Sequence, residues 1–137
     1  MKKLIIILSL FTCYAQAGII ADTIYLEARG ENQWGRRAVT TVIYNRAYIR
    51  QQSFEEVCLS RKQFSCWNNG YYKPSVVTAE QKKIMKECLQ YEFQMLSGLF
   101  RPLDNWDHYH NIHVKPSWTN EMENVVVIGK QKFGRIE

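Results

Sequence analysis

The amino-acid sequence predicts an α+β fold, namely a mainly helical domain with a small antiparallel sheet or hairpin near its C-terminus. Three observations support this prediction. Apolar residues recur at helical spacing through most of the chain, two capping boxes mark helix starts, and the one β-branched run followed by a turn comes late. A chain of 137 residues is long enough for one compact domain and too short for two of ordinary size.

Residues 1–17 have the pattern of an export signal. Two lysines precede an apolar run at 4–11, and Ala15-Gln16-Ala17 has the small residues of a cleavage site. The apolar run is too short for a dedicated membrane span. We therefore expect cleavage after Ala17, a single domain over residues 18–137, a secreted or periplasmic location and no stable membrane span. Retention of the segment as a temporary anchor is the alternative, because residues 18–21 extend the apolar stretch.

The first two helices follow this segment. Ile20, Ile24 and Ala28 trace an apolar stripe that closes at Gly30. A second helix is expected to begin after Asn32, whose side chain can cap it. Its apolar stripe consists of Trp34, Ala38, Val39, Val42, Ile43 and Ala47.

Two capping boxes predict the next helices. Ser53-Phe54-Glu55-Glu56 opens a short helix through Cys58, and Thr78-Ala79-Glu80-Gln81 opens a longer one that stops near Gly98. Between them, residues 63–74 are aromatic and rich in turn-forming residues, so a loop is expected there.

The end of the chain predicts the sheet. Residues 125–128 are β-branched, Gly129-Lys130 can form a turn, and residues 131–133 complete a hairpin; residues 106–110 are a candidate third strand. The three cysteines that follow the signal are an odd number for an oxidising compartment. One disulfide plus one buried thiol is the simplest account, with the pairing among Cys58, Cys66 and Cys88 left open.

Glu27 and Glu31 lie four residues apart where the first helix ends. A carboxylic acid at the end of a packed helix, partly screened from water, can hold a proton ready for a glycosidic oxygen. The alternative is an ordinary helix end with solvated acids. Trp67 and Trp118 stand beside polar residues on loops, where flat aromatic faces suit sugar rings. Burial of such aromatic residues in the core is the competing interpretation.

Other chemistries find less support. His108, His110 and His113 lie close together, and alternate strand residues share a face, but no H-E-x-x-H pattern accompanies them. We expect no metal and no cofactor; a secreted zinc peptidase is a minor alternative. The serines and Cys66 lack a G-x-S-x-G elbow. The net charge of +5 comes from dispersed basic residues, so nucleic acid is not an expected partner.

Five segments in this order resemble the SleB/CwlJ-type cell-wall hydrolases. They are LEARGE at 26–31, VIYNR at 42–46, QFSCWN at 63–68, HYHN at 108–111 and PSW at 116–118. The resemblance implies a lysozyme-like, mostly helical domain with a small sheet that cleaves the glycan strands of peptidoglycan. It further implies a lytic transglycosylase acting after N-acetylmuramic acid, with Glu27 as its single acid and base. A hydrolytic muramidase and a non-catalytic peptidoglycan-binding module are the alternatives, and we expect a monomer.

The same motifs and the aromatic loops supply candidates for substrate binding or for structural roles near the site. These candidates are Glu31, Asn45, Trp67, Tyr109, Asn111, Ser117 and Trp118. The chain departs from the family pattern at Leu26, commonly Gly, at Asp107, commonly Thr, and at Ile112, often Pro. Asp107 matters most, because a second carboxylate near the site would allow a hydrolytic mechanism.

Overall fold

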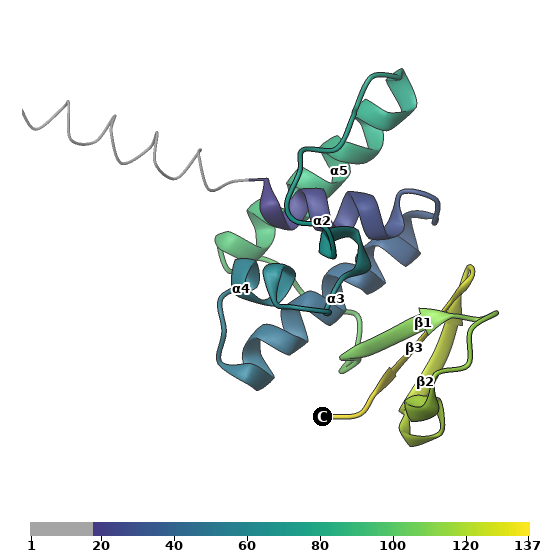
Figure 1. Ribbon diagram of the computed structural model, residues 1–137. Coiled ribbons are helices and arrows are strands. Elements are labelled where there is room, and N and C mark those ends of the chain that lie inside the picture. The colour runs from purple at the N-terminus through teal and green to yellow at the C-terminus, as the bar shows by residue number, and fades with distance from the viewer. Residues whose placement is uncertain (1–17) are drawn as a thin grey trace, which may run out of the picture.

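The computed structural model describes residues 18–137, so the predicted export signal at 1–17 lies outside the described part. The elements are, in chain order, α2 (Ile19–Ala28), α3 (Gln33–Arg50), α4 (Phe54–Leu59), η1 (Ser65–Trp67), α5 (Ala79–Leu96), β1 (His108–Asn111), η2 (Ser117–Glu121), β2 (Glu123–Ile128) and β3 (Gln131–Arg135). The helices form one part of the molecule, and the three strands lie beside α3 (Figure 1). The predicted α+β class is confirmed.

Local hydrogen bonds fix where three of the helices begin. The Asn32 side chain accepts a hydrogen bond from the backbone N–H of Gly35 at the start of α3, at 2.9 Å. Ser53 and Thr78 each form a complete capping box, at α4 and α5 respectively. Such caps satisfy backbone donors that the helix itself leaves unpaired, so they mark helix starts in the sequence. All three helix starts were predicted correctly.

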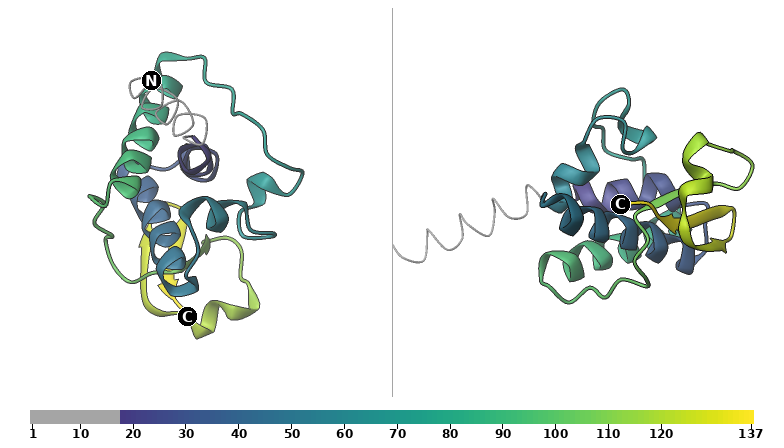
Figure 2. Two further views of the ribbon diagram at one scale, coloured as in Figure 1. Left: turned by 90° about the vertical axis from the view of Figure 1, so that its left-hand side faces the viewer. Right: turned by 90° about the horizontal axis from the view of Figure 1, so that it is seen from below.

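Helix α2 lies at the centre of the helical part. It contacts α3, α4, α5 and η1, and in Figure 2 (left) it is seen along its axis, between α5 and the segment that leads into α5. Ile20, Ile24 and Tyr25 are at most 1% exposed, and the polar residues Asp22 and Thr23 are buried as well. A helix buried on nearly every side has little freedom to shift, so the residues of its last turn are held in place.

The sheet is antiparallel in the order β1-β3-β2. Tyr109 of β1 pairs with Phe133 of β3, and Val126 of β2 pairs with Phe133 from the other side, after an irregularity that begins at Glu123. Phe133 is fully buried and its ring contacts those of Trp106 and Tyr109. This aromatic cluster joins the sheet to the helical part, and both the hairpin and the third strand occur where they were predicted.

The cysteines differ from the expectation. Cys58, Cys66 and Cys88 are all thiols, so the predicted disulfide is absent from the described residues. Cys58 lies on α4 and Cys88 on α5, and each of these helices packs against α2. Burial raises the pKa of both thiols to about 12, which keeps them in the unreactive protonated form. Within residues 18–137, no helix is both long and apolar enough to cross a membrane.

Candidate active site

Glu27 occupies the last turn of α2 and is partly buried. Its Oε2 accepts a hydrogen bond from the hydroxyl of Tyr109 at 2.8 Å. Its Oε1 accepts a longer one, 3.4 Å, from the backbone N–H of Cys66. Three sequence motifs therefore meet at one carboxylate: the end of α2, the η1 loop and strand β1.

Tyr109 is held as a hydrogen-bond donor. Its ring stacks on Phe133, with ring centroids 5.4 Å apart. Burial, and then the charge of Glu27, raise the pKa of the Tyr109 hydroxyl well above its usual value. The hydroxyl therefore keeps its proton at any physiological pH and donates it toward Glu27.

Cys66 donates its backbone N–H to Glu27, and its thiol adjoins the same carboxylate. Burial, and then the neighbouring charge of Glu27, raise the pKa of the Cys66 thiol. A thiol that stays protonated is a poor nucleophile, and its charged neighbour is a carboxylate, not a histidine. The geometry thus disfavours a cysteine nucleophile at this position.

Trp67 lies on the side of η1 next to α2. Its indole N–H donates to the hydroxyl of Thr23, one turn before Glu27, at 2.9 Å. Its ring contacts Tyr71 and Tyr72, with centroids 4.9 and 5.6 Å apart. The two tyrosines are 44% and 51% exposed, so an aromatic surface adjoins the loop that contacts Glu27.

Glu31 is directed elsewhere. Its Oε2 lies 3.4 Å from the backbone N–H of Lys130, which donates to it from the turn between β2 and β3. The carboxylate also lies against Gly129, whose φ of +59° is left-handed, and a side chain at Gly129 would collide with it. Glu31 therefore links the end of α2 to the hairpin.

Asn45 and Asn111 both hold backbone. The Asn45 side chain donates to the carbonyls of Asp104 and Trp106, at 2.9 and 2.7 Å, and so fastens the segment that leads into β1. The Asn111 side chain accepts from the backbone N–H of His113 at 2.9 Å, just after β1. Both asparagines thus have structural contacts, and neither contacts Glu27.

Trp118 packs against the histidine pair. Its ring lies edge-on to His108 and His110, with centroids 5.2 and 5.4 Å apart, as expected for alternate residues on one strand face. His110 Nε2 lies 2.8 Å from the Thr119 hydroxyl, and Ser117 is exposed at the start of η2. Among residues 18–137, no three His, Cys, Asp or Glu side chains are grouped so that they could hold a metal ion.

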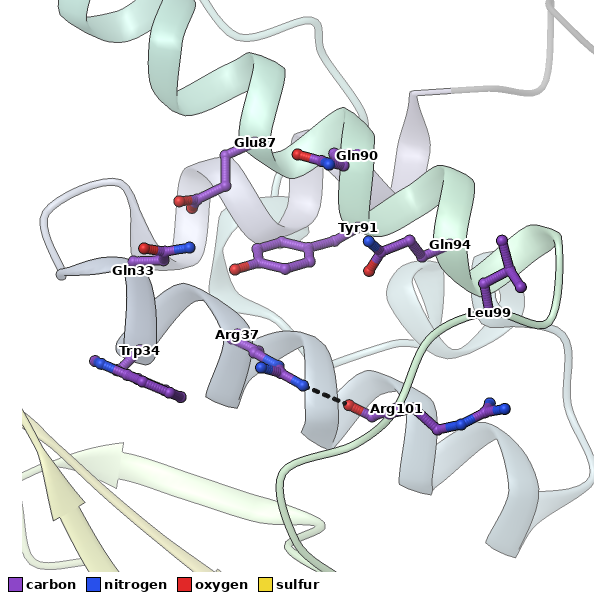
Figure 3. A pocket seen from close by; sticks show the side chains of 9 residues that line it. All are labelled: Gln33, Trp34, Arg37, Glu87, Gln90, Tyr91, Gln94, Leu99 and Arg101. Atoms are coloured by element: carbon purple, nitrogen blue, oxygen red, sulfur yellow. Dashed lines mark hydrogen bonds between the residues drawn. The ribbon is translucent and has the colours of Figure 1, made fainter.

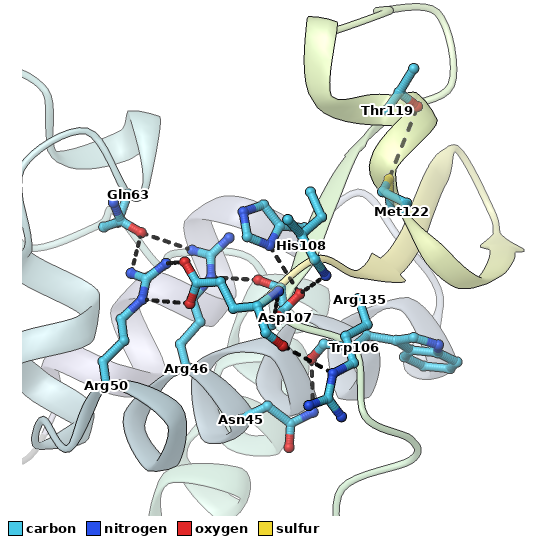
Figure 4. Close-up of polar contacts among 12 residues, drawn as sticks. Asn45, Arg46, Arg50, Gln63, Trp106, Asp107, His108, Thr119, Met122 and Arg135 are labelled. Carbon is cyan, nitrogen blue, oxygen red and sulfur yellow. Dashed lines mark hydrogen bonds and ion pairs between the residues drawn. The ribbon is translucent and has the colours of Figure 1, made fainter.

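Asp107 is fully buried and anchors the end of the chain. Its carboxylate accepts from the backbone N–H groups of Ile136 and Glu137, both at 2.8 Å, and lies 3.0 Å from His108 Nδ1. The Asp107 carbonyl accepts from Arg46 Nε at 2.6 Å (Figure 4). With these partners, Asp107 is fixed as a structural carboxylate.

Sequence reasoning missed three of these roles. Arg46, the last residue of VIYNR, is 6% exposed and donates to the carbonyl of Asp107, the residue just before β1. Thr23 holds Trp67, and Phe133 supports Tyr109. All three contacts join segments far apart in sequence. Arg46 stood inside a motif, and that position was the signal that could have pointed to its role.

Comparison with known proteins gives the family. A family model described as cell wall hydrolase matches residues 30–134. The chain belongs to the cell wall hydrolase family. The match begins at Gly30, three residues after Glu27, so it covers the partners of Glu27 on η1 and β1 but not the glutamate itself.

Solved structures share the fold of this cell wall hydrolase. The catalytic domain of the germination-specific lytic transglycosylase SleB from Bacillus anthracis superposes with a TM-score of 0.65 at 23% identity, covering 85% of this chain and 91% of that chain. The catalytic domain of the SleB protein from Bacillus cereus gives 0.60 at 24% identity, covering 85% and 87%. No curated protein matches the chain.

A hollow of about 420 Å³ lies elsewhere on this cell wall hydrolase, between α3 and α5. Figure 3 shows the amides of Gln33, Gln90 and Gln94 around it. None of its lining residues is Glu27 or contacts Glu27. It is therefore separate from the candidate active site.

Proposed function

We propose that the protein cleaves the glycan strands of peptidoglycan as a lytic transglycosylase, acting after N-acetylmuramic acid with Glu27 as its one acid and base. The observation that carries this proposal is the position of a single partly buried carboxylate between two donors, Tyr109 and Cys66. Membership of the cell wall hydrolase family supports the substrate class. The fold shared with a lytic transglycosylase supports the reaction type.

The mechanism begins with proton donation. Protonated Glu27 gives its proton to the bridging oxygen, and positive charge develops at the sugar carbon as the bond breaks. The carboxylate that results gains negative charge, which the Tyr109 hydroxyl and the Cys66 N–H stabilise by charge-assisted hydrogen bonds. Glu27 then accepts the proton of the C6 hydroxyl of the same sugar, and that oxygen closes an anhydro ring without water.

One carboxylate suffices for this route, whereas ordinary retaining and inverting glycosidases use two. The two other acids that sequence placed near the site have other partners. Glu31 contacts the β2–β3 turn, and Asp107 holds the backbone of Ile136 and Glu137. This arrangement favours the transglycosylase over a hydrolytic muramidase.

Sugar binding would use the aromatic surface beside η1. The ring of Trp67 contacts those of Tyr71 and Tyr72, and both tyrosines are exposed. Aromatic faces pack well against the apolar face of a pyranose. With cleavage of the signal after Ala17, the enzyme would act outside the cytoplasm, where peptidoglycan lies, as a single catalytic domain over residues 18–137.

Mass analysis of digested peptidoglycan tests the proposal. We expect anhydro-muramyl products, each lighter by one water than the hydrolysed product. Reducing-end muramic acid alone would identify a muramidase, and binding to insoluble wall without release of fragments would identify a binding module. Loss of activity with a chelator would instead point to a zinc peptidase.

The Glu27→Gln variant tests the assignment of the acid. We expect turnover to fall by about 10³-fold, within the range for loss of a general acid, while wall binding and the melting temperature stay near those of the wild type. Glu31→Gln is the matched control and should keep turnover of the same order as the wild type. Full activity in Glu27→Gln would refute the assignment.

A further inference from the structure

Helix α2 begins at a carboxylate supplied by a distant helix. Glu92 of α5 accepts from the backbone nitrogen of Gly18 through Oε1, at 2.7 Å, and from that of Ala21 through Oε2, at 2.8 Å. The Glu92 side chain is only 3% exposed. The first residue of the described chain is therefore bound inside the protein.

Glu92 has no cationic partner. Within residues 18–137, no lysine, arginine or histidine nitrogen forms an ion pair with it. Burial raises the pKa of Glu92, against the effect of its hydrogen bonds to Ala21 and Gly18. A buried carboxylate without a cation is costly.

The carboxylates of Glu92, Asp22 and Glu55 outnumber the one ammonium of the cluster, that of Lys73, by two formal charges. Asp22, which is 3% exposed, binds the ammonium of Lys73 at 3.0 Å and the hydroxyl of Tyr71 at 2.6 Å. Glu55 of α4 and the thiol of Cys88 are the other titratable groups around this pair. One further positive charge at Gly18 would halve this excess.

Gly18 fits a processed terminus. A Cβ at residue 18 would lie 2.6 Å from the flexible end of Lys73, so the small Gly18 leaves room around its nitrogen. Ala15 and Ala17 just before it are the small residues of the predicted cleavage site. The predicted cut therefore falls at the nitrogen that Glu92 binds.

We propose that cleavage of the Ala17–Gly18 peptide bond by an export signal peptidase converts the Gly18 nitrogen into an α-ammonium that forms a buried ion pair with Glu92. Water adds across the bond: the Ala17 carbonyl carbon takes the oxygen and becomes a carboxylate, and the Gly18 nitrogen takes both protons and becomes an ammonium. The positive end of the α2 dipole and the nearby ammonium of Lys73 oppose an ammonium at this place. The carboxylates of Glu92, Asp22 and Glu55 favour it.

The new ion pair would stabilise α2, the helix that carries Glu27. Removal of the signal thereby strengthens the active form of the enzyme after export. This inference concerns processing and stability, so it does not depend on the reaction that the site catalyses.

The test uses the full chain, exported with its own signal by a bacterial host. Intact mass should give a product that begins at Gly18. An NMR titration of its α-amino group should give a pKa above the ordinary value of about 8. In Glu92→Gln the pKa should return to that ordinary value.

The melting temperature should show the same coupling. Below about pH 8, Glu92→Gln should melt about 3–6 °C lower than the wild type. Because the ammonium contributes only while it is protonated, its share of this difference is lost as the pH rises through its raised folded pKa.

A second variant covers the case in which Glu92→Gln does not fold. Duplication of Ala17, with the new terminus checked by mass, moves the ammonium one residue away from Glu92, and its pKa should then be ordinary. A product that begins at a residue other than Gly18, or an α-amino group with an ordinary pKa in the wild type, overturns the proposal.

Discussion

The hydroxyl of Tyr109 donates a hydrogen bond to Glu27 Oε2 across 82 positions of sequence. This contact joins the central helix to the first strand of the sheet. It also directs one oxygen of the carboxylate, while the backbone N–H of Cys66 directs the other. The orientation of the proposed acid therefore depends on the packing of the sheet against the helices.

Tyr109→Phe should reduce turnover by about 10- to 100-fold, because a hydrogen bond to a charged group contributes about 1.5–3 kcal/mol. The ring and its stacking on Phe133 remain, so the melting temperature should change little. Steady-state kinetics on solubilised peptidoglycan gives the measurement. Tyr91→Phe is the control, a buried tyrosine that does not contact Glu27. Equal effects of the two changes would contradict the positioning role.

Cys66→Ala should keep turnover of the same order as the wild type, because the backbone N–H of residue 66 provides the contact to Glu27. The raised pKa of the thiol also predicts slow alkylation by iodoacetamide at pH 8. Activity assays and mass spectrometry of the alkylated protein measure both. A loss as large as that of Glu27→Gln would show that the thiol takes part in the reaction.

Gly129→Ala should lower the free energy of unfolding by at least about 1–2 kcal/mol, the cost of a left-handed backbone with a Cβ. Contact with the Glu31 carboxylate adds to this cost. Urea unfolding provides the measurement. Gly30→Ala is the control, since nothing lies within 4 Å of a Cβ at that position.

The Glu31→Ala background separates the two costs. There Gly129→Ala should lose less stability than in the wild type, because only the backbone strain remains. The same loss in both backgrounds would mean that Glu31 does not press on the turn.

Acid should weaken the attachment of the last residues. Arg50 binds both carboxylate oxygens of Glu137, at 2.8 and 3.1 Å, and this hydrogen bonding lowers the pKa of Glu137 below 4.5. A carboxylate whose pKa is lower in the folded state stabilises the fold at pH values above its unfolded-state pKa. This contribution is lost as the pH falls through the folded-state pKa. Between pH 7 and pH 3, the melting temperature should therefore fall less steeply in Arg50→Gln than in the wild type.

This acid effect should be small and should shrink in high salt, since Glu137 is about one third exposed and solvent screens the pair. Lys73→Gln is a suitable control because its ion pair is with Asp22, in the first turn of α2, and does not involve Glu137. Parallel curves for the wild type and Arg50→Gln would contradict the role of this pair.

The features that the sequence predicted correctly depend on neighbours in the chain. Asn32, Ser53 and Thr78 cap helices through backbone groups only three residues away, and the hairpin follows from one turn between two short strands. Such local patterns carry their own physical reason, so element starts were predictable without a tertiary model.

The roles that the sequence left open depend on distant partners. Asn45 was a candidate for the substrate site, yet its amide holds the carbonyls of Asp104 and Trp106. Asp107 raised the prospect of a second acid, yet its carboxylate holds backbone at residues 136 and 137. A polar residue within a motif looks the same in sequence whether it faces a ligand or a remote backbone group.

The hydrogen bond between β1 and α2 also sets an order of events during synthesis. Glu27 leaves the ribosome early, whereas Tyr109 and its support Phe133 belong to the last segments to be made. A nascent polypeptide thus carries the proposed acid without the donor that orients it. The two side chains come together only after the strands of the sheet have been made.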